Sequence, residues 1–128
     1  MPYLITIWLA FVFVLSLAPY EVKYHFGTKG ALHDAGHVGI FFITAILLCW
    51  NAEGVGRKLF RCFLAFCVVF ASEGLEKLVY HDRFEWNDVA MDTGGVLVGF
   101  AFAMLAGMML TNLKRRSRMP QSSRSSSI

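Results

Sequence analysis

Residues 72–99 read SEGLEKLVYHDRFEWNDVAMDTGGVLVG, and they place six carboxylates between two long apolar runs. The run before them covers residues 59–71, and the run after them covers residues 96–110. Ionisable groups at the edge of hydrocarbon are costly, so their concentration here indicates a functional site. The stretch therefore predicts two membrane helices joined by a polar turn, with the site at that turn.

The composition indicates a membrane protein rather than an ordinary soluble domain. The 128 residues are 56% hydrophobic and 15% aromatic, and only 16% of them are charged. Soluble domains carry about 25% charged residues. The net charge of +3 comes mainly from the last fifteen residues, and no nucleic-acid motif accompanies it. We therefore expect one small integral membrane domain whose partner is the lipid bilayer. We do not expect it to bind nucleic acid.

The apolar runs predict an all-α fold, a four-helix transmembrane bundle within one membrane domain over residues 1–111. The expected spans are 3–20, 35–51, 59–80 and 88–111. Residues 112–128 are basic and then Ser-rich, so we expect a disordered cytoplasmic tail. The small residues Ser16 and Ala18 also fit a signal-peptide cleavage site, but no Lys or Arg precedes them and a retained helix is expected.

The distribution of Lys and Arg predicts that both termini are cytoplasmic. Eight of the twelve basic residues lie in the 51–61 turn and in the tail. Cytoplasmic loops carry an excess of such residues. Eight of the nine acids and all four histidines then fall at the outer face, where they form a polar cluster.

Helical spacing indicates which of these outer groups converge. Four pairs lie three or four residues apart and so share a helix face: His33 and His37, Asp34 and His37, Glu73 and Glu76, Asp88 and Asp92. Asp88 has a structural alternative, because it can also cap the start of the fourth helix. Cys49, Cys62 and Cys67 fall in the inner halves of the spans, and we expect reduced packing residues rather than a disulfide framework.

A stripe of small residues in the last span predicts close helix packing. Its members recur every four residues: Gly95, Gly99, Ala103 and Gly107. Small residues let a neighbouring backbone approach in a membrane, where the hydrophobic effect no longer drives association. Asp92 precedes Gly95 by three residues, so we expect its carboxylate to point into the bundle.

Several of these positions carry a family resemblance, namely His37, Glu73, Glu76, Arg83, Asp88, Asp92 and Gly95. Over residues 33–102 the chain resembles the VanZ-like family of small membrane proteins, named for a member associated with teicoplanin resistance. Glu76 and Asp92 stand where Gln and Asn are usual, and Arg83 lies one residue late. The resemblance implies a multi-pass protein of the bacterial inner (cytoplasmic) membrane that acts in glycopeptide resistance or envelope homeostasis. Its implied partner is a lipid-linked cell-wall component or a glycopeptide, and the oligomeric state is left open.

Two other functions fit the same residues. A membrane hydrolase or transferase acting on a lipid-linked substrate would use Glu73, His37, Asp88 and Asp92 as catalytic residues. Arg83 and Glu76 would bind the substrate, with Arg83 holding a phosphate or carboxylate. An ion or proton pathway is the second alternative, although the inner halves of the spans are apolar apart from Thr44 and the cysteines.

No cofactor is predicted from the motifs. A divalent metal remains a candidate ligand because His33, His37 and Glu73 are residue types that bind such ions. A His-x-x-x-His spacing alone is common on helices, and no further histidine box accompanies it.

Overall fold

The computed structural model describes residues 2–18, 31–50, 52–81 and 85–117. These residues form four α-helices: α1 (Pro2–Ser16), α3 (Ala31–Trp50), α4 (Val55–Tyr80) and α5 (Trp86–Ser117). Within the described ranges there is no β-strand. The predicted all-α class is confirmed for this part of the chain.

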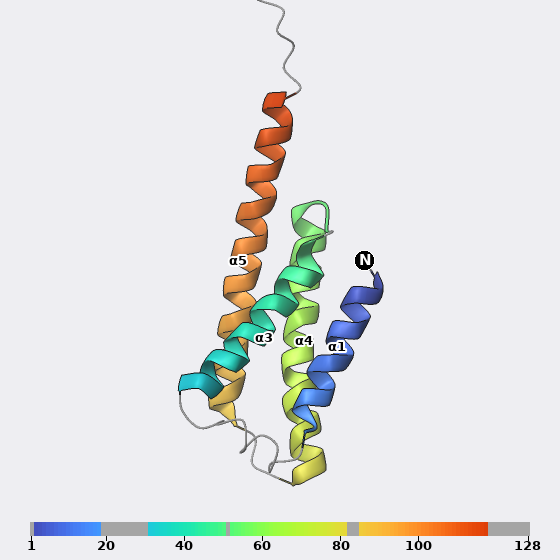
Figure 1. Ribbon diagram of the computed structural model, residues 1–128, viewed down its shortest axis with the longest axis vertical. Helices are drawn as coiled ribbons and strands as arrows, with labels where there is room; N and C mark the ends of the chain where they lie inside the picture. Colours follow the sequence, from blue (N-terminus) through green and yellow to red (C-terminus); the bar gives the residue numbers. More distant parts are fainter. Residues whose placement is uncertain (1, 19–30, 51, 82–84, 118–128) are drawn as a thin grey trace, which may run out of the picture.

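The helices run alternately in opposite directions along the molecule (Figure 1). α5 ends at the top of the view and α1 begins about level with the middle of α5, whereas the end of α4 and the start of α5 lie at the lower end. We call the lower end the acidic end, because it carries His37, Glu73, Asp88 and Asp92. The opposite end is the basic end, because the first turns of α4 carry Arg57, Lys58 and Arg61 and the last turns of α5 carry Lys114.

The helix boundaries depart from the predicted spans, most of all at the C-terminus. α3 and α4 each begin four residues earlier than expected, and α5 covers 86–117 rather than 88–111. Residues 112–117, which we expected in a disordered tail, are therefore helical. The apolar pattern shows where the hydrophobic sequence ends, not where the helix ends. Lys and Arg have almost the same helix propensity as Leu, so α5 continues through the basic residues after the apolar run. Residues 118–128 of the predicted tail lie outside the described residues.

α3 and α5 pack closely and run in parallel. A side-chain carbon on Gly95 would meet the carbonyl oxygen of Val38, and one on Gly99 would meet that of Phe42. Glycine at these two positions lets the helix backbones touch. Ala103 is buried one turn further on, but Gly107 faces the Lys58 ammonium group on α4 instead of a helix backbone.

Hydrogen bonds attach α1 to the other helices. The Trp8 indole N–H donates to the hydroxyl of Thr44 at 2.9 Å, within the apolar core around Phe41, Ala45 and Val69. At the acidic end the Tyr80 hydroxyl donates to the carbonyl of Leu17 at 2.6 Å. These bonds tie α1 to α3 and to α4.

One helix, α5, is long and apolar enough to cross a membrane. Two further apolar helical stretches are shorter, Tyr3–Ser16 and Asp34–Trp50. Among the described residues the structure thus supplies one candidate span of the four expected.

Candidate functional site

His37 and Asp92 join α3 to α5 at the acidic end. The Nδ1 atom of the imidazole lies 2.8 Å from Oδ1 of the carboxylate. Asp92 is only 2% exposed, whereas the His37 side chain is 26% exposed. The close contact between Gly95 and Val38 explains this pairing, because Val38 follows His37 and Gly95 lies one turn after Asp92. The glycine contact therefore seats the imidazole against the carboxylate.

Asp88 lies one turn before Asp92 and faces the other side of the imidazole. Its Oδ2 atom is 3.8 Å from Nε2 of His37, and its side chain is 15% exposed. Of the two roles weighed for Asp88, the structure does not place it at the cap position, because α5 begins at Trp86 and Asp88 is its third residue. The backbone N–H groups of Asp88 and Val89 bond instead to the carbonyl of Glu85. A carboxylate in this first turn still lies at the positive end of the helix dipole.

Glu73 links the end of α4 to the start of α5. It is 7% exposed, and its Oε1 atom accepts a hydrogen bond of 2.8 Å from the backbone N–H of Glu85. The first N–H groups of a helix have no partner within that helix, so a carboxylate there satisfies one of them. Asp88 lies within electrostatic range of both Glu73 and His37. We call His37, Glu73, Asp88 and Asp92 the acidic cluster.

The other predicted site residues stand in different relations to this cluster. Glu76 lies one turn after Glu73, partly buried, and within electrostatic range of both His37 and Glu73. Arg83 lies outside the described residues, as does the side chain of His33, whose backbone belongs to α3. The structure thus brings together the four predicted catalytic candidates and adds Glu76 at their edge.

The described side chains do not assemble a metal site of the predicted kind. Among them, no group of three or more His, Cys, Asp and Glu residues is arranged to hold a metal ion. Glu73 directs Oε1 to a backbone N–H, and both ring nitrogens of His37 face carboxylates. Of the three proposed ligands, His37 and Glu73 are therefore already used in protein contacts.

The arrangement is suited to hydrogen bonding and proton exchange with a polar ligand. A buried carboxylate at Nδ1 fixes the orientation of an imidazole and the position of its proton. The Nε2 edge is then the part of the ring that can donate or accept a proton from a bound group, beside Asp88. This chemistry depends on Asp92 remaining buried behind the ring.

One partner in the site has no signal in the sequence. The backbone N–H of Glu85, the residue before α5, holds Glu73 of α4, which lies twelve positions earlier in the chain. Side-chain types and helical spacing describe single helices, so they cannot indicate a bond across a turn.

No family model matches this chain, and neither does any curated protein or solved structure. The site is therefore defined by its geometry.

Proposed function

We propose that this chain is a VanZ-like, multi-pass protein of a bacterial cytoplasmic membrane, and that its acidic cluster binds a lipid-linked cell-wall component at the outer face. The observation that carries the proposal is the His37 imidazole, held by the buried Asp92 with its Nε2 edge directed toward Asp88. The family assignment is supported by the motif residues of the sequence. Membrane insertion and ligand class are supported by separate features of the structure.

Large apolar side chains on the outside of all four helices support insertion of the whole bundle. Those more than half exposed include Ile7, Val14, Phe60, Phe63, Leu97, Leu105 and Met109. Ile43 of α3 is also exposed. Soluble monomers rarely leave contiguous apolar patches larger than a few hundred Å² in water. Lipid chains would cover these surfaces without cost, and the helices satisfy their own backbone groups as a bilayer requires.

Segregation of charge along the molecule supports the orientation. Arg57, Lys58 and Arg61 lie at the same end as the basic last turn of α5, opposite the acidic cluster. An excess of basic residues is typical of cytoplasmic ends, which makes the acidic end the outer one. A tag added after Ile128 should accordingly be accessible to external reagents only after the cells are opened. A tag accessible from outside intact cells would contradict this orientation.

The charge of the acidic cluster indicates the chemistry of the ligand. The cluster holds three carboxylates and one imidazole, so it favours ligands that bring hydrogen-bond donors or positive charge. Hydroxyl, amide and amino groups of a lipid-linked wall precursor, or of a glycopeptide, are donors of this kind. A membrane location would present the first of these ligands directly to the outer ends of the helices.

An enzymatic function is the second candidate, and the His37–Asp92 pair favours it. Such a pair can act as a general base toward water or a substrate hydroxyl, which would give a hydrolase or a transferase on the same lipid-linked molecule.

An ion pathway receives no comparable support. From Asp92 toward the basic end the helices meet through Phe41, Ala45 and Val96, and Thr44 is already hydrogen-bonded to Trp8 and to the carbonyl of Ile40.

The experiment is a binding titration of the purified full chain in an uncharged detergent. The probes are a polyprenyl diphosphate-linked wall precursor, the same polyprenyl phosphate without its headgroup, and teicoplanin. We expect headgroup-dependent binding that the double variant His37→Ala, Glu73→Gln loses and that Asp34→Asn, which removes a carboxylate outside the acidic cluster, retains. Unchanged binding by a folded double variant would contradict the proposal. Mass analysis of the precursor after incubation reports hydrolysis or transfer, and elemental analysis of the same samples reports any bound metal.

A further inference from the structure

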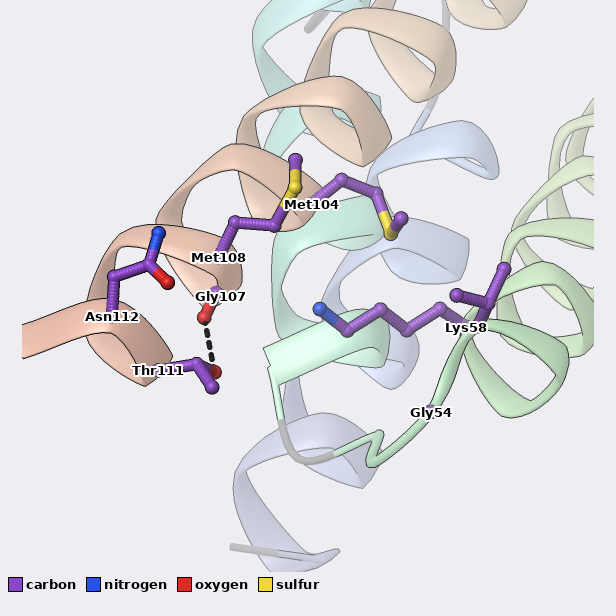
Figure 2. A pocket seen from close by; sticks show the side chains of 8 residues that line it. Gly54, Lys58, Met104, Gly107, Met108, Thr111 and Asn112 are labelled. Atoms are coloured by element: carbon purple, nitrogen blue, oxygen red, sulfur yellow. Dashed lines mark hydrogen bonds between the residues drawn. The ribbon is translucent and has the colours of Figure 1, made fainter. Parts of the chain in front are cut away.

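A polar cavity lies at the basic end, far from the acidic cluster. It has a volume of about 340 Å³ and lies between the start of α4 and the last turns of α5 (Figure 2). Val55, Met104 and Met108 supply apolar walls, whereas Lys58, Thr111 and Asn112 supply polar groups. A cavity that combines one cation with flexible apolar walls suits an amphipathic anion.

Lys58 is the cation of this cavity. Figure 2 shows its side chain extended from α4 toward Gly107 of α5, and its Nζ atom lies 3.4 Å from the carbonyl oxygen of Ala103. Gly107 makes room for the ammonium group, because a Cβ there would lie 2.6 Å from Nζ. An ammonium group has three donors, so it can bind a ligand in addition to this carbonyl.

The neighbouring basic residues are used differently. Arg57 pairs with Glu53 at 4.0 Å, and Arg61 donates a hydrogen bond of 2.8 Å to the carbonyl of Leu48 at the end of α3. Across residues 2–18, 31–50, 52–81 and 85–117, no carboxylate lies at ion-pair distance from Lys58. The charge of Lys58 is therefore directed into the cavity without an acidic partner from the described part of the chain.

Polar groups on α5 complete the cavity. The Thr111 hydroxyl uses its proton in a 2.8 Å hydrogen bond to the carbonyl of Gly107, whereas Asn112 adds an amide N–H that can donate to an anion (Figure 2). Arg115 and Arg116 line an adjacent cavity on the same helix, so the local potential is positive. The flexible methionine side chains can adapt to the hydrocarbon part of a ligand.

We propose that this cavity binds the phosphate headgroup of an anionic phospholipid of the inner leaflet, with Lys58 as the residue that contacts the phosphate. Basic pockets between membrane helices on the cytoplasmic side are suited to such headgroups. The inference rests on the proposed membrane insertion and orientation, but it is independent of the ligand of the acidic cluster.

The test is native mass spectrometry of the full chain in an uncharged detergent, titrated with phosphatidylglycerol or with phosphatidylcholine of the same acyl chains. We expect the protein to prefer phosphatidylglycerol, and Lys58→Gln to weaken this binding about fivefold, as for one cation near a lipid surface. Lys114→Gln is the matched control, because it removes the same charge at the same end outside the cavity. Its binding should stay close to that of the unmodified chain.

A second variant separates the cavity from the net charge. Gly107→Ala keeps every charge but displaces the Lys58 ammonium group, so it should weaken phosphatidylglycerol binding as well. Equal losses in Lys58→Gln and Lys114→Gln would overturn the proposal, and so would equal binding of the two lipids. Competition by inorganic phosphate at the lipid's own concentration would show a free-phosphate site and overturn the lipid assignment. Binding of the wall precursor is measured separately, so failure of either site is recognised independently.

Discussion

The Nδ1 atom of His37 and the Oδ1 atom of Asp92 lie 2.8 Å apart, and this bond connects two parallel helices across 55 positions of the chain. The carboxylate is almost fully buried, whereas the imidazole is partly open. The pair is therefore both a structural link and the innermost part of the acidic cluster.

This link can be measured with a double-mutant cycle. The variants His37→Ala, Asp92→Ala and their combination should give a coupling free energy of about 1–3 kcal/mol, because either single change removes the short hydrogen bond between the imidazole and the buried carboxylate. The same cycle with Asp88→Ala should give less than about 1 kcal/mol, since its contact is longer and more exposed. Unfolding by dodecyl sulfate in mixed micelles supplies the free energies. Equal coupling for the two aspartates would contradict the geometry.

The close contact of α3 and α5 predicts that alanine substitution destabilises the protein at Gly99 but not at Gly94. Gly99→Ala places a methyl group against the Phe42 carbonyl and should cost about 1–3 kcal/mol through overpacking. Gly94→Ala meets no atom within 4 Å, so it should cause no loss. The larger change Gly99→Leu should prevent correct folding altogether. Melting temperatures of the three purified variants test this, and similar values for the two alanine variants would mean that α5 presents another face to α3.

The parts of the fold that followed from sequence are those that repeat within a single helix. Apolar runs located the four helices, and the spacing of Asp88 and Asp92 placed both carboxylates on one face of α5. The boundaries were less predictable, because residues 112–117 continue α5 after the apolar pattern ends. Helix propensity acts beyond the region that hydrophobic burial selects.

Contacts between helices were not available from the sequence. The choice of His37 rather than another histidine as the partner of Asp92 depends on the register of α3 against α5, which the Gly95 and Gly99 contacts set. The insertion of Lys58 beside Gly107 is a second example, since the regular stripe of small residues predicted a helix neighbour there. Local patterns identify candidate faces, but packing decides which faces meet.

Two substitutions of Glu73 should distinguish its structural role from its role in ligand binding. Glu73→Gln keeps an oxygen that can accept the Glu85 N–H bond, so the variant should insert and melt like the unmodified chain while losing binding of the wall precursor. Glu73→Ala removes the acceptor and should also lower stability by about 1–2 kcal/mol. Membrane insertion, melting and precursor binding are measured for both variants. If Glu73→Gln binds the precursor as well as the unmodified chain does, the charge of the Glu73 carboxylate is not required for binding.

The cysteines give a test of membrane insertion in the unmodified chain. Cys49 and Cys62 are buried, whereas Cys67 is exposed on α4, about 18 Å along the helix from its start at Val55. If lipid covers α4, a water-soluble maleimide should leave Cys67 unmodified in membrane vesicles, because the reactive thiolate does not form in hydrocarbon. The same reagent should modify Cys67 after the protein is unfolded in dodecyl sulfate. Peptide mass mapping identifies the modified residue.

The matched control places a cysteine where we expect water. Lys114→Cys lies on the exposed last turns of α5 and should react in vesicles whose cytoplasmic face is accessible. Its modification shows that the reagent reaches the protein under the conditions in which Cys67 does not react. If Cys67 reacts as fast as the control cysteine in intact vesicles, the exposed face of α4 contacts water. The apolar surface of that helix would then need a protein partner in place of lipid, because Phe60, Phe63 and Phe70 would otherwise form an exposed patch.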